Sequence, residues 1–242
     1  MAVNSTTHAQ IVTTLLQRHS LPISPTWLST HLAAPRSGPT PPLASLTQTA
    51  LFRLLASDFT ASLSKANPSS LFPPDINDPN TKERRLGSDV PVQLLSVEDI
   101  GSSNWSQIEA IERIERGEEV RGREIVRTVD VDGADARGGA AGQASTPAVS
   151  SGGPHKYLLQ DANGTKVVAW EKEKMQKMSL GDKECVIGMK IVLKNGLLVR
   201  RGLLMLEKNY VTVLGGKVEA WDEAWKKGAK QRLLDALPEN GS

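Results

Sequence analysis

The sequence predicts an α+β protein: an N-terminal three-helix bundle, then a five-stranded closed β-barrel with a long insertion loop and a C-terminal helix. Three observations predict this class. Apolar residues recur at helical spacing over residues 6–65, and from residue 90 onward they fall in short strand-like runs. Between the first and the later runs, residues 133–154 are rich in Gly, Ala, Ser and Pro. A chain of 242 residues is long enough for one or two domains with cores of their own.

Residues 1–65 are predicted to form the helical bundle. A first apolar stripe at helical spacing ends before Pro22. Ser24 followed by Pro25 supplies an N-cap and a proline at the first position of a second helix. The Pro-rich stretch at 35–42 cannot continue that helix, so it is expected to connect to a third helix with a broad apolar face.

Residues 66–89 are predicted to be a polar linker punctuated by prolines. Its apolar Phe72 and Ile76 would allow it to wrap along the protein rather than hang free. The next apolar run, from Val90 to Val97, predicts the first strand of the barrel.

An insertion at residues 102–154 is predicted between the first and second barrel strands. It opens with a short helix that carries Ile108, Ile111 and Ile114 at three-residue spacing. Its second half is low in complexity and is expected to be mobile, because such residues bury too little surface to offset the entropy of ordering. The isoleucines could dock on a partner or pack back onto the barrel, and the sequence leaves both open.

The rest of the barrel is predicted after residue 154. Asn163-Gly164 marks a hairpin, a charged segment at 171–177 is a helix-prone bridge, and a last amphipathic helix covers 217–237. The domain predicted over 90–237 therefore fits a Greek-key barrel of the oligonucleotide/oligosaccharide-binding (OB) type. The further strands are expected at residues 155–160, 165–170, 186–193, 197–206 and 210–214.

Composition excludes several classes of protein. The only cysteine, Cys185, can form neither an internal disulfide nor a cysteine zinc site, which indicates a reducing compartment. Neither a membrane span nor a secretory signal is expected, so we expect a soluble intracellular protein. The four histidines are scattered along the chain, and no pattern predicts a catalytic residue, a metal site, a cofactor or a small-molecule substrate.

Nucleic-acid binding is the alternative function for a barrel of this type. Residues 155–242 hold sixteen Lys or Arg against eleven Asp or Glu, and Lys194, Arg200 and Arg201 are the candidate contacts. Single-strand binders also need exposed rings on which bases stack. The predicted strands offer few of them, so an ordinary solvated charged face is the competing interpretation. The available rings are Tyr157, Trp170 and Tyr210.

Three stretches carry a family resemblance. They are Pro-Thr-Trp-Leu at 25–28; Leu94–Val97 with Asn104–Ile108; and, most specific, Gly188–Leu193 with Arg201–Leu206 and Val211–Gly216. Together they resemble the N-terminal region of the RecQ-mediated genome instability protein family. The length of 242 residues resembles the short fungal forms, which lack the second, C-terminal barrel of the animal proteins.

The resemblance implies a noncatalytic nuclear scaffold that works with topoisomerase III, a type IA enzyme, and a RecQ-family helicase. It would promote decatenation and double Holliday junction dissolution, with DNA contacted weakly or within the complex. The insertion would reach the topoisomerase gate, and the family's topoisomerase-contact lysine falls on Lys190, expected on the surface. The docking motif would comprise Trp105, Gln107, Ile108 and Ile111. The two remaining function classes are this scaffold and a stand-alone single-strand-binding module.

Overall fold

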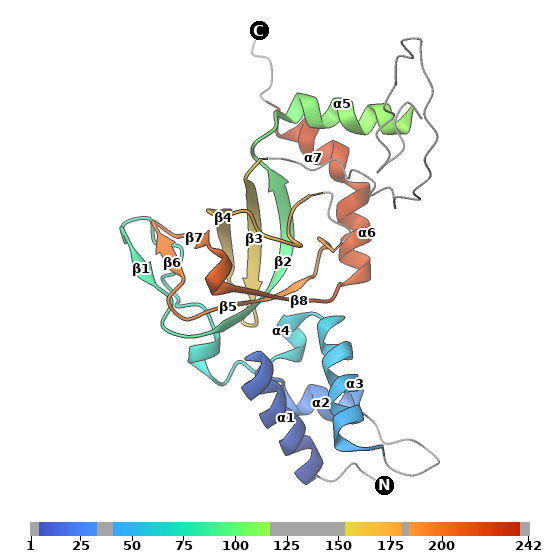
Figure 1. Cartoon of the computed structure of the whole chain (residues 1–242), viewed down its shortest axis with the longest axis vertical. Coiled ribbons are helices and arrows are strands. Elements are labelled where there is room, and N and C mark those ends of the chain that lie inside the picture. Colours follow the sequence, from blue (N-terminus) through green and yellow to red (C-terminus); the bar gives the residue numbers. More distant parts are fainter. Residues whose placement is uncertain (1–4, 33–40, 117–152, 181–183, 238–242) are drawn as a thin grey trace, which may run out of the picture.

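The computed structural model describes residues 5–32, 41–116, 153–180 and 184–237. The helices of the N-terminal bundle lie at one end of the molecule and a curled sheet lies in the middle (Figure 1). The helix of the insertion and the last helix of the chain lie at the opposite end, and the helix that precedes the last one runs alongside the sheet (Figure 1). The low-complexity loop predicted at 133–154 falls outside the described residues except for its last two positions.

The bundle contains four helices rather than the predicted three. The expected third helix is interrupted because Asp58 caps a separate turn of helix, its Oδ1 accepting a hydrogen bond from the Thr60 amide at 2.8 Å. The predicted cap Ser24 is confirmed, since its side chain accepts from the Trp27 amide. The four helices are α1 (Ser5–His19), α2 (Pro25–His31), α3 (Leu43–Leu55) and α4 (Phe59–Ser62).

Residues 66–89 wrap along the barrel. After the 3₁₀ turn η1 (Pro68–Ser70), the side chains of Phe72 and Ile76 are buried in the barrel core. The Phe72 amide donates to the buried Asp161 carboxylate at 2.9 Å. A two-residue strand, β1 (Arg84–Arg85), then joins the edge of the sheet.

The sheet has eight strands in the order β1-β6-β7-β4-β3-β2-β5-β8, instead of the five predicted. Six strand segments were expected along the sequence for this five-stranded barrel, and two further strands arise because β1 adds to one edge and the turn at Arg201-Gly202 divides the strand expected at 197–206. The strand order and the parallel β4–β7 pair curl the sheet toward closure. The remaining bounds are β2 (Val90–Asp99), β3 (His155–Asp161), β4 (Lys166–Glu171), β5 (Lys190–Leu193), β6 (Leu198–Arg200), β7 (Leu203–Leu206) and β8 (Val211–Gly215), with the 3₁₀ turn η2 (Lys208–Tyr210) before β8.

Strand β2 is the longest strand of the described sheet. It pairs antiparallel with β3 on one side and with β5 on the other, which confirms that residues 90–100 close on strands beyond the insertion. Val90, Val92, Leu94 and Val97 are all buried, as expected of a strand that is covered on its inner face. The core of the barrel is therefore assembled from segments more than fifty residues apart in sequence.

Two helical predictions after β4 differ from the structure. The segment expected as a helical bridge at 171–177 forms turns, because the Glu171 carboxylate accepts from the Met175 amide at 2.6 Å and the His155 amide at 2.9 Å. The C-terminal helix is broken at Gly228 into α6 (Glu219–Lys227) and α7 (Ala229–Asp235). None of the helices in the described residues is long and apolar enough to span a bilayer.

Candidate protein-binding surface

The insertion leaves and re-enters the barrel through a narrow neck. The Ile100 amide donates to the Pro154 carbonyl at 3.0 Å, so the two ends of the insertion lie side by side. A Cβ atom added to Gly101 would lie 2.3 Å from the Cα of Gly153. Such a contact is too close for any side chain, so this position requires glycine. The buried Asp99 carboxylate also accepts from the Gly101 amide at 2.7 Å. The direction in which the insertion leaves the barrel is thus fixed by backbone contacts.

Helix α5 (Asn104–Glu115) begins immediately beyond this neck. Ser103 caps it, its Oγ accepting from the Ser106 amide at 3.2 Å. The side-chain amide of Gln107 reaches back and donates to the carbonyls of Asp99 at 3.1 Å and Ser102 at 3.0 Å. Gln107, predicted to bind a partner, therefore positions α5 on the barrel.

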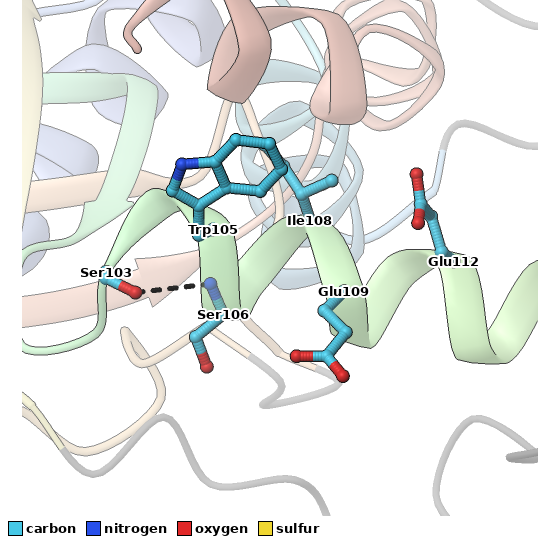
Figure 2. A pocket seen from close by; sticks show the side chains of 6 residues that line it. All are labelled: Ser103, Trp105, Ser106, Ile108, Glu109 and Glu112. Atoms are coloured by element: carbon cyan, nitrogen blue, oxygen red, sulfur yellow. Dashed lines mark hydrogen bonds between the residues drawn. The ribbon is translucent and has the colours of Figure 1, made fainter. Parts of the chain in front are cut away.

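One side of α5 presents an apolar surface around Trp105. Trp105, Ile108 and Glu112 project from this side, whereas Ser106 and Glu109 project from the other (Figure 2). Trp105 is 66% exposed and Ile108 is only 2% exposed. Ile111 is half-buried, so of the predicted docking residues Trp105 alone is largely open to solvent. The open pocket here measures about 410 Å³ and is lined by Ser103, Trp105, Ser106, Ile108, Glu109 and Glu112.

Helix α7 lies against α5 (Figure 1). Lys230 of α7 forms ion pairs with Glu112 at 3.2 Å and Glu115 at 3.0 Å, and the hydrogen bond with Glu115 raises the pKa of Lys230. The side-chain amide of Asn104 donates to the Ala236 carbonyl at 3.4 Å. The helix of the insertion thus packs against the C-terminal helix, an arrangement that neither interpretation of its isoleucines anticipated.

The surface position expected for Lys190 is wrong. Its side chain is fully buried at the start of β5, and its Nζ donates to Gln93 Oε1 at 3.0 Å. The ammonium lies 4.8 Å from the centroid of the Phe59 ring, at the junction of the barrel with the helical bundle. Burial lowers the pKa of Lys190 to about 7, with Asp58 opposing the shift. Lys190 therefore has no direct access to a partner in this structure.

Sequence reasoning missed Gln93, which organises this junction. The only available signal was a polar residue inside the apolar run from Val90 to Val97. Gln93 is fully buried, and its Oε1 accepts from the Phe59 amide at 2.9 Å as well as from Lys190. A buried amide in a strand is stable when its donors and acceptor are all paired, as they are here.

The three cations proposed to contact nucleic acid have partners within the chain. Lys194 pairs with Asp89 at 2.8 Å and Arg200 with Glu83 at 3.7 Å. Arg201, in the turn between β6 and β7, has its guanidinium 3.5 Å from the Pro79 carbonyl. Of the aromatic rings, Tyr157 is fully buried, Tyr210 packs against the barrel core and Trp170 is 43% exposed. Of these three candidate rings only Trp170 is exposed, and two of the three cations are paired with carboxylates, which disfavours a stacking platform for single strands.

No group of His, Cys, Asp and Glu able to hold a metal ion occurs within the described ranges. The closest ionisable pair in the core, His155 and Glu171, lies at 2.6 Å between Nδ1 and Oε2. The other ring nitrogen of His155 accepts from the Leu180 amide at 3.3 Å. Both nitrogens are used within the fold, so this pair anchors the end of the insertion to the barrel.

Comparison with known proteins agrees with this division into a helical bundle and a barrel. The family model described as RMI1, N-terminal OB-fold domain, matches residues 72–229, and the model described as RMI1, N-terminal helical domain, matches residues 15–62. RecQ-mediated genome instability protein 1 of Schizosaccharomyces pombe (strain 972 / ATCC 24843) is 31% identical over 159 residues, which cover 63% of this chain and 65% of that protein. The chain thus spans slightly less than two thirds of the length of this relative. With its OB-fold model matched over more than half of the chain, the protein belongs to the RMI1 family.

Proposed function

We propose that this protein is a noncatalytic nuclear scaffold of a genome-maintenance complex. It joins a RecQ-family helicase to topoisomerase III and promotes decatenation and double Holliday junction dissolution. The name of the S. pombe relative supports the link with RecQ, and the matched OB-fold and helical domains support a binding role. In this proposal topoisomerase III binds the Trp105 side of α5 and the insertion beyond it.

The observation that carries the proposal is a large exposed ring on a helix that is held in place. Trp105 is 66% exposed, although a tryptophan gains considerable free energy when its ring is buried. The Asp99 carboxylate and the Gln107 side chain fix the start of α5, so little further ordering of this turn is needed when a partner binds. Exposed aromatic side chains on pre-ordered elements are typical of protein-binding surfaces.

Replacing residues 103–152 with a short Gly/Ser linker tests the proposal. The replacement retains Asp99, Gly101 and Gly153, so the neck and the barrel stay intact. We expect the shortened protein to fold, to bind topoisomerase III more weakly in titration calorimetry, and to lose most of its stimulation in a decatenation assay. Full binding and full stimulation at saturating concentration would exclude the insertion as the topoisomerase contact.

The salt dependence of binding separates the scaffold from a nucleic-acid-binding module. Binding driven by phosphate contacts weakens steeply with salt, because counterions are released from the nucleic acid. We expect the intact protein alone to bind an oligonucleotide weakly and to bind topoisomerase III with a shallow salt dependence. Tight, salt-sensitive binding of single-stranded DNA by the isolated protein would favour the alternative function instead.

A further inference from the structure

The helical bundle is attached to the barrel through a small number of specific contacts. At one side, the Ser20 hydroxyl donates to the Asp89 carboxylate at 2.9 Å. At the other, the N-terminus of α4 contacts β2 through Gln93. Between them Leu214 of β8 packs against the bundle core. Polar contacts, together with the apolar contacts of Leu214 and Ala162, therefore hold the bundle on the barrel.

Lys190 occupies the centre of this junction. Its backbone lies opposite Gln93 in β2 and Gly215 in β8, and its side chain points toward the Phe59 ring of α4. The side chain is fully buried, and among the described residues it has one hydrogen-bond acceptor, Gln93 Oε1. A neutral amine has two N–H groups and no charge, whereas an ammonium has three N–H groups and a full charge, so the charged form leaves more donors unpaired here. The charged form is therefore poorly accommodated while the bundle is docked.

The hydrogen bonds of Gln93 link Lys190 directly to α4. The same oxygen that accepts from Lys190 also accepts from the Phe59 amide, the first of α4. The Gln93 amide nitrogen donates to Asp58 Oδ1 at 2.7 Å and to Gln160 Oε1 at 3.1 Å. Any movement that gives a charged Lys190 access to water must therefore disturb the contacts that hold α4 on β2.

The ionisable groups around Lys190 identify Asp58 as the one that acts on it. Burial works to raise the pKa of Asp58, but hydrogen bonds from Gln93 and Thr60 outweigh it and hold that pKa below its usual value. The described segments β8 and α4 carry no ionisable side chain. Glu98 and Asp99 lie at the far end of β2 from Gln93, and at the far end of β5 Lys194 is paired with Asp89.

We propose that Lys190 is a proton-controlled latch between the helical bundle and the barrel. Loss of its proton tightens the packing of α4 on β2, and gain of the proton loosens it. In the docked state burial holds the pKa of Lys190 at about 7, against 10.5 when the side chain is in water. Docking is therefore expected to strengthen between these two values, by up to about tenfold per pH unit, and to change little below pH 7.

Hydrogen exchange of the Phe59 amide in the intact protein tests the latch. We expect its protection, corrected for the chemical exchange rate, to rise about eightfold from pH 7.5 to 8.5. Amides of β3, which open only when the barrel unfolds, should be more strongly protected than Phe59 and show the same rise, because unfolding of the barrel also exposes Lys190 to water. In Lys190→Met the rise should vanish, while the control variant Lys227→Met, which changes an exposed lysine on α6, should keep it.

Each other outcome counts against the latch. Equal protection of Phe59 and β3 at every pH would mean that Phe59 opens only with the whole chain, so that Lys190 affects folding and not docking. A rise that persists in Lys190→Met would assign the pH dependence to another group. If that variant does not fold, the titration of Lys190 in the wild-type protein, followed by NMR of its side chain, decides: a midpoint near 7 supports the latch and one near 10 overturns it.

Discussion

Truncation of Trp105 to alanine should separate partner binding from folding. The ring is 66% exposed, so its loss removes little packing within the protein. We expect the free energy of unfolding to change by less than about 1 kcal/mol, as for most surface substitutions. A variant with nearly unchanged stability allows its binding defect to be read directly.

The expected binding defect follows from the exposed area of the ring. A tryptophan buries roughly 150–250 Å² when it is fully covered, and about two thirds of that is available on Trp105. At about 25 cal/mol per Å², covering this area contributes roughly 2–4 kcal/mol, comparable with the larger effects in alanine scans. Loss of 2–4 kcal/mol weakens binding by roughly 30- to 900-fold.

Titration calorimetry with topoisomerase III measures this effect, and Phe52→Ala supplies the matched control. Phe52 is 76% exposed on α3, in the bundle at the opposite end of the molecule from α5 (Figure 1). We expect Phe52→Ala to bind topoisomerase III like the wild type. Wild-type affinity of Trp105→Ala would refute our reasoning about α5, and equal weakening by both variants would place the interface elsewhere.

Three stability predictions are measured by equilibrium denaturation. Gln93→Leu removes the acceptor of two buried donors and should cost about 2–4 kcal/mol, whereas loss of under 1 kcal/mol would mean that water replaces it. Gly216→Ala would place a Cβ 2.4 Å from a backbone carbonyl oxygen of α3, at a position with φ +82°. It should lower the free energy of unfolding clearly more than Gly215→Ala, at a position with φ +81° and open space around it. Equal losses would contradict the close approach. Asp222→Ala leaves a buried amide without its acceptor at 3.0 Å and should cost about 1–3 kcal/mol, a prediction that fails if α6 stays equally protected from exchange.

Local signals in the sequence were sufficient for much of the fold. The Ser24-Pro25 start of a helix and the Asn163-Gly164 hairpin were predicted correctly, because each depends on the conformational preferences of a few adjacent residues. The pairing of the strand at 90–100 with later strands was also correct, since an apolar strand needs partners on both edges. The division of the predicted third helix at Asp58 was missed because the apolar pattern runs across it.

The candidate site was less predictable because exposure depends on tertiary contacts. Lys190 carries a charge and was expected at the surface, but the bundle covers the start of β5 and buries it. Gln107 lies next to the exposed Trp105 in sequence, yet its side chain turns back to the neck. Neither outcome can be derived from the spacing of residues along one element.

The separation of β2 from its sheet partners has a consequence for synthesis of the chain. Residues 100–154 must be translated before the first residue of β3 is made, and β5 follows later still. At roughly 5–20 residues per second, an apolar strand emerges from the ribosome several seconds before it can pair. During that interval Val90 to Val97 resembles an unprotected edge, open to association with other nascent chains. Chaperone demand during translation is therefore expected to be greatest at this point of the chain, and shortening the insertion should reduce it.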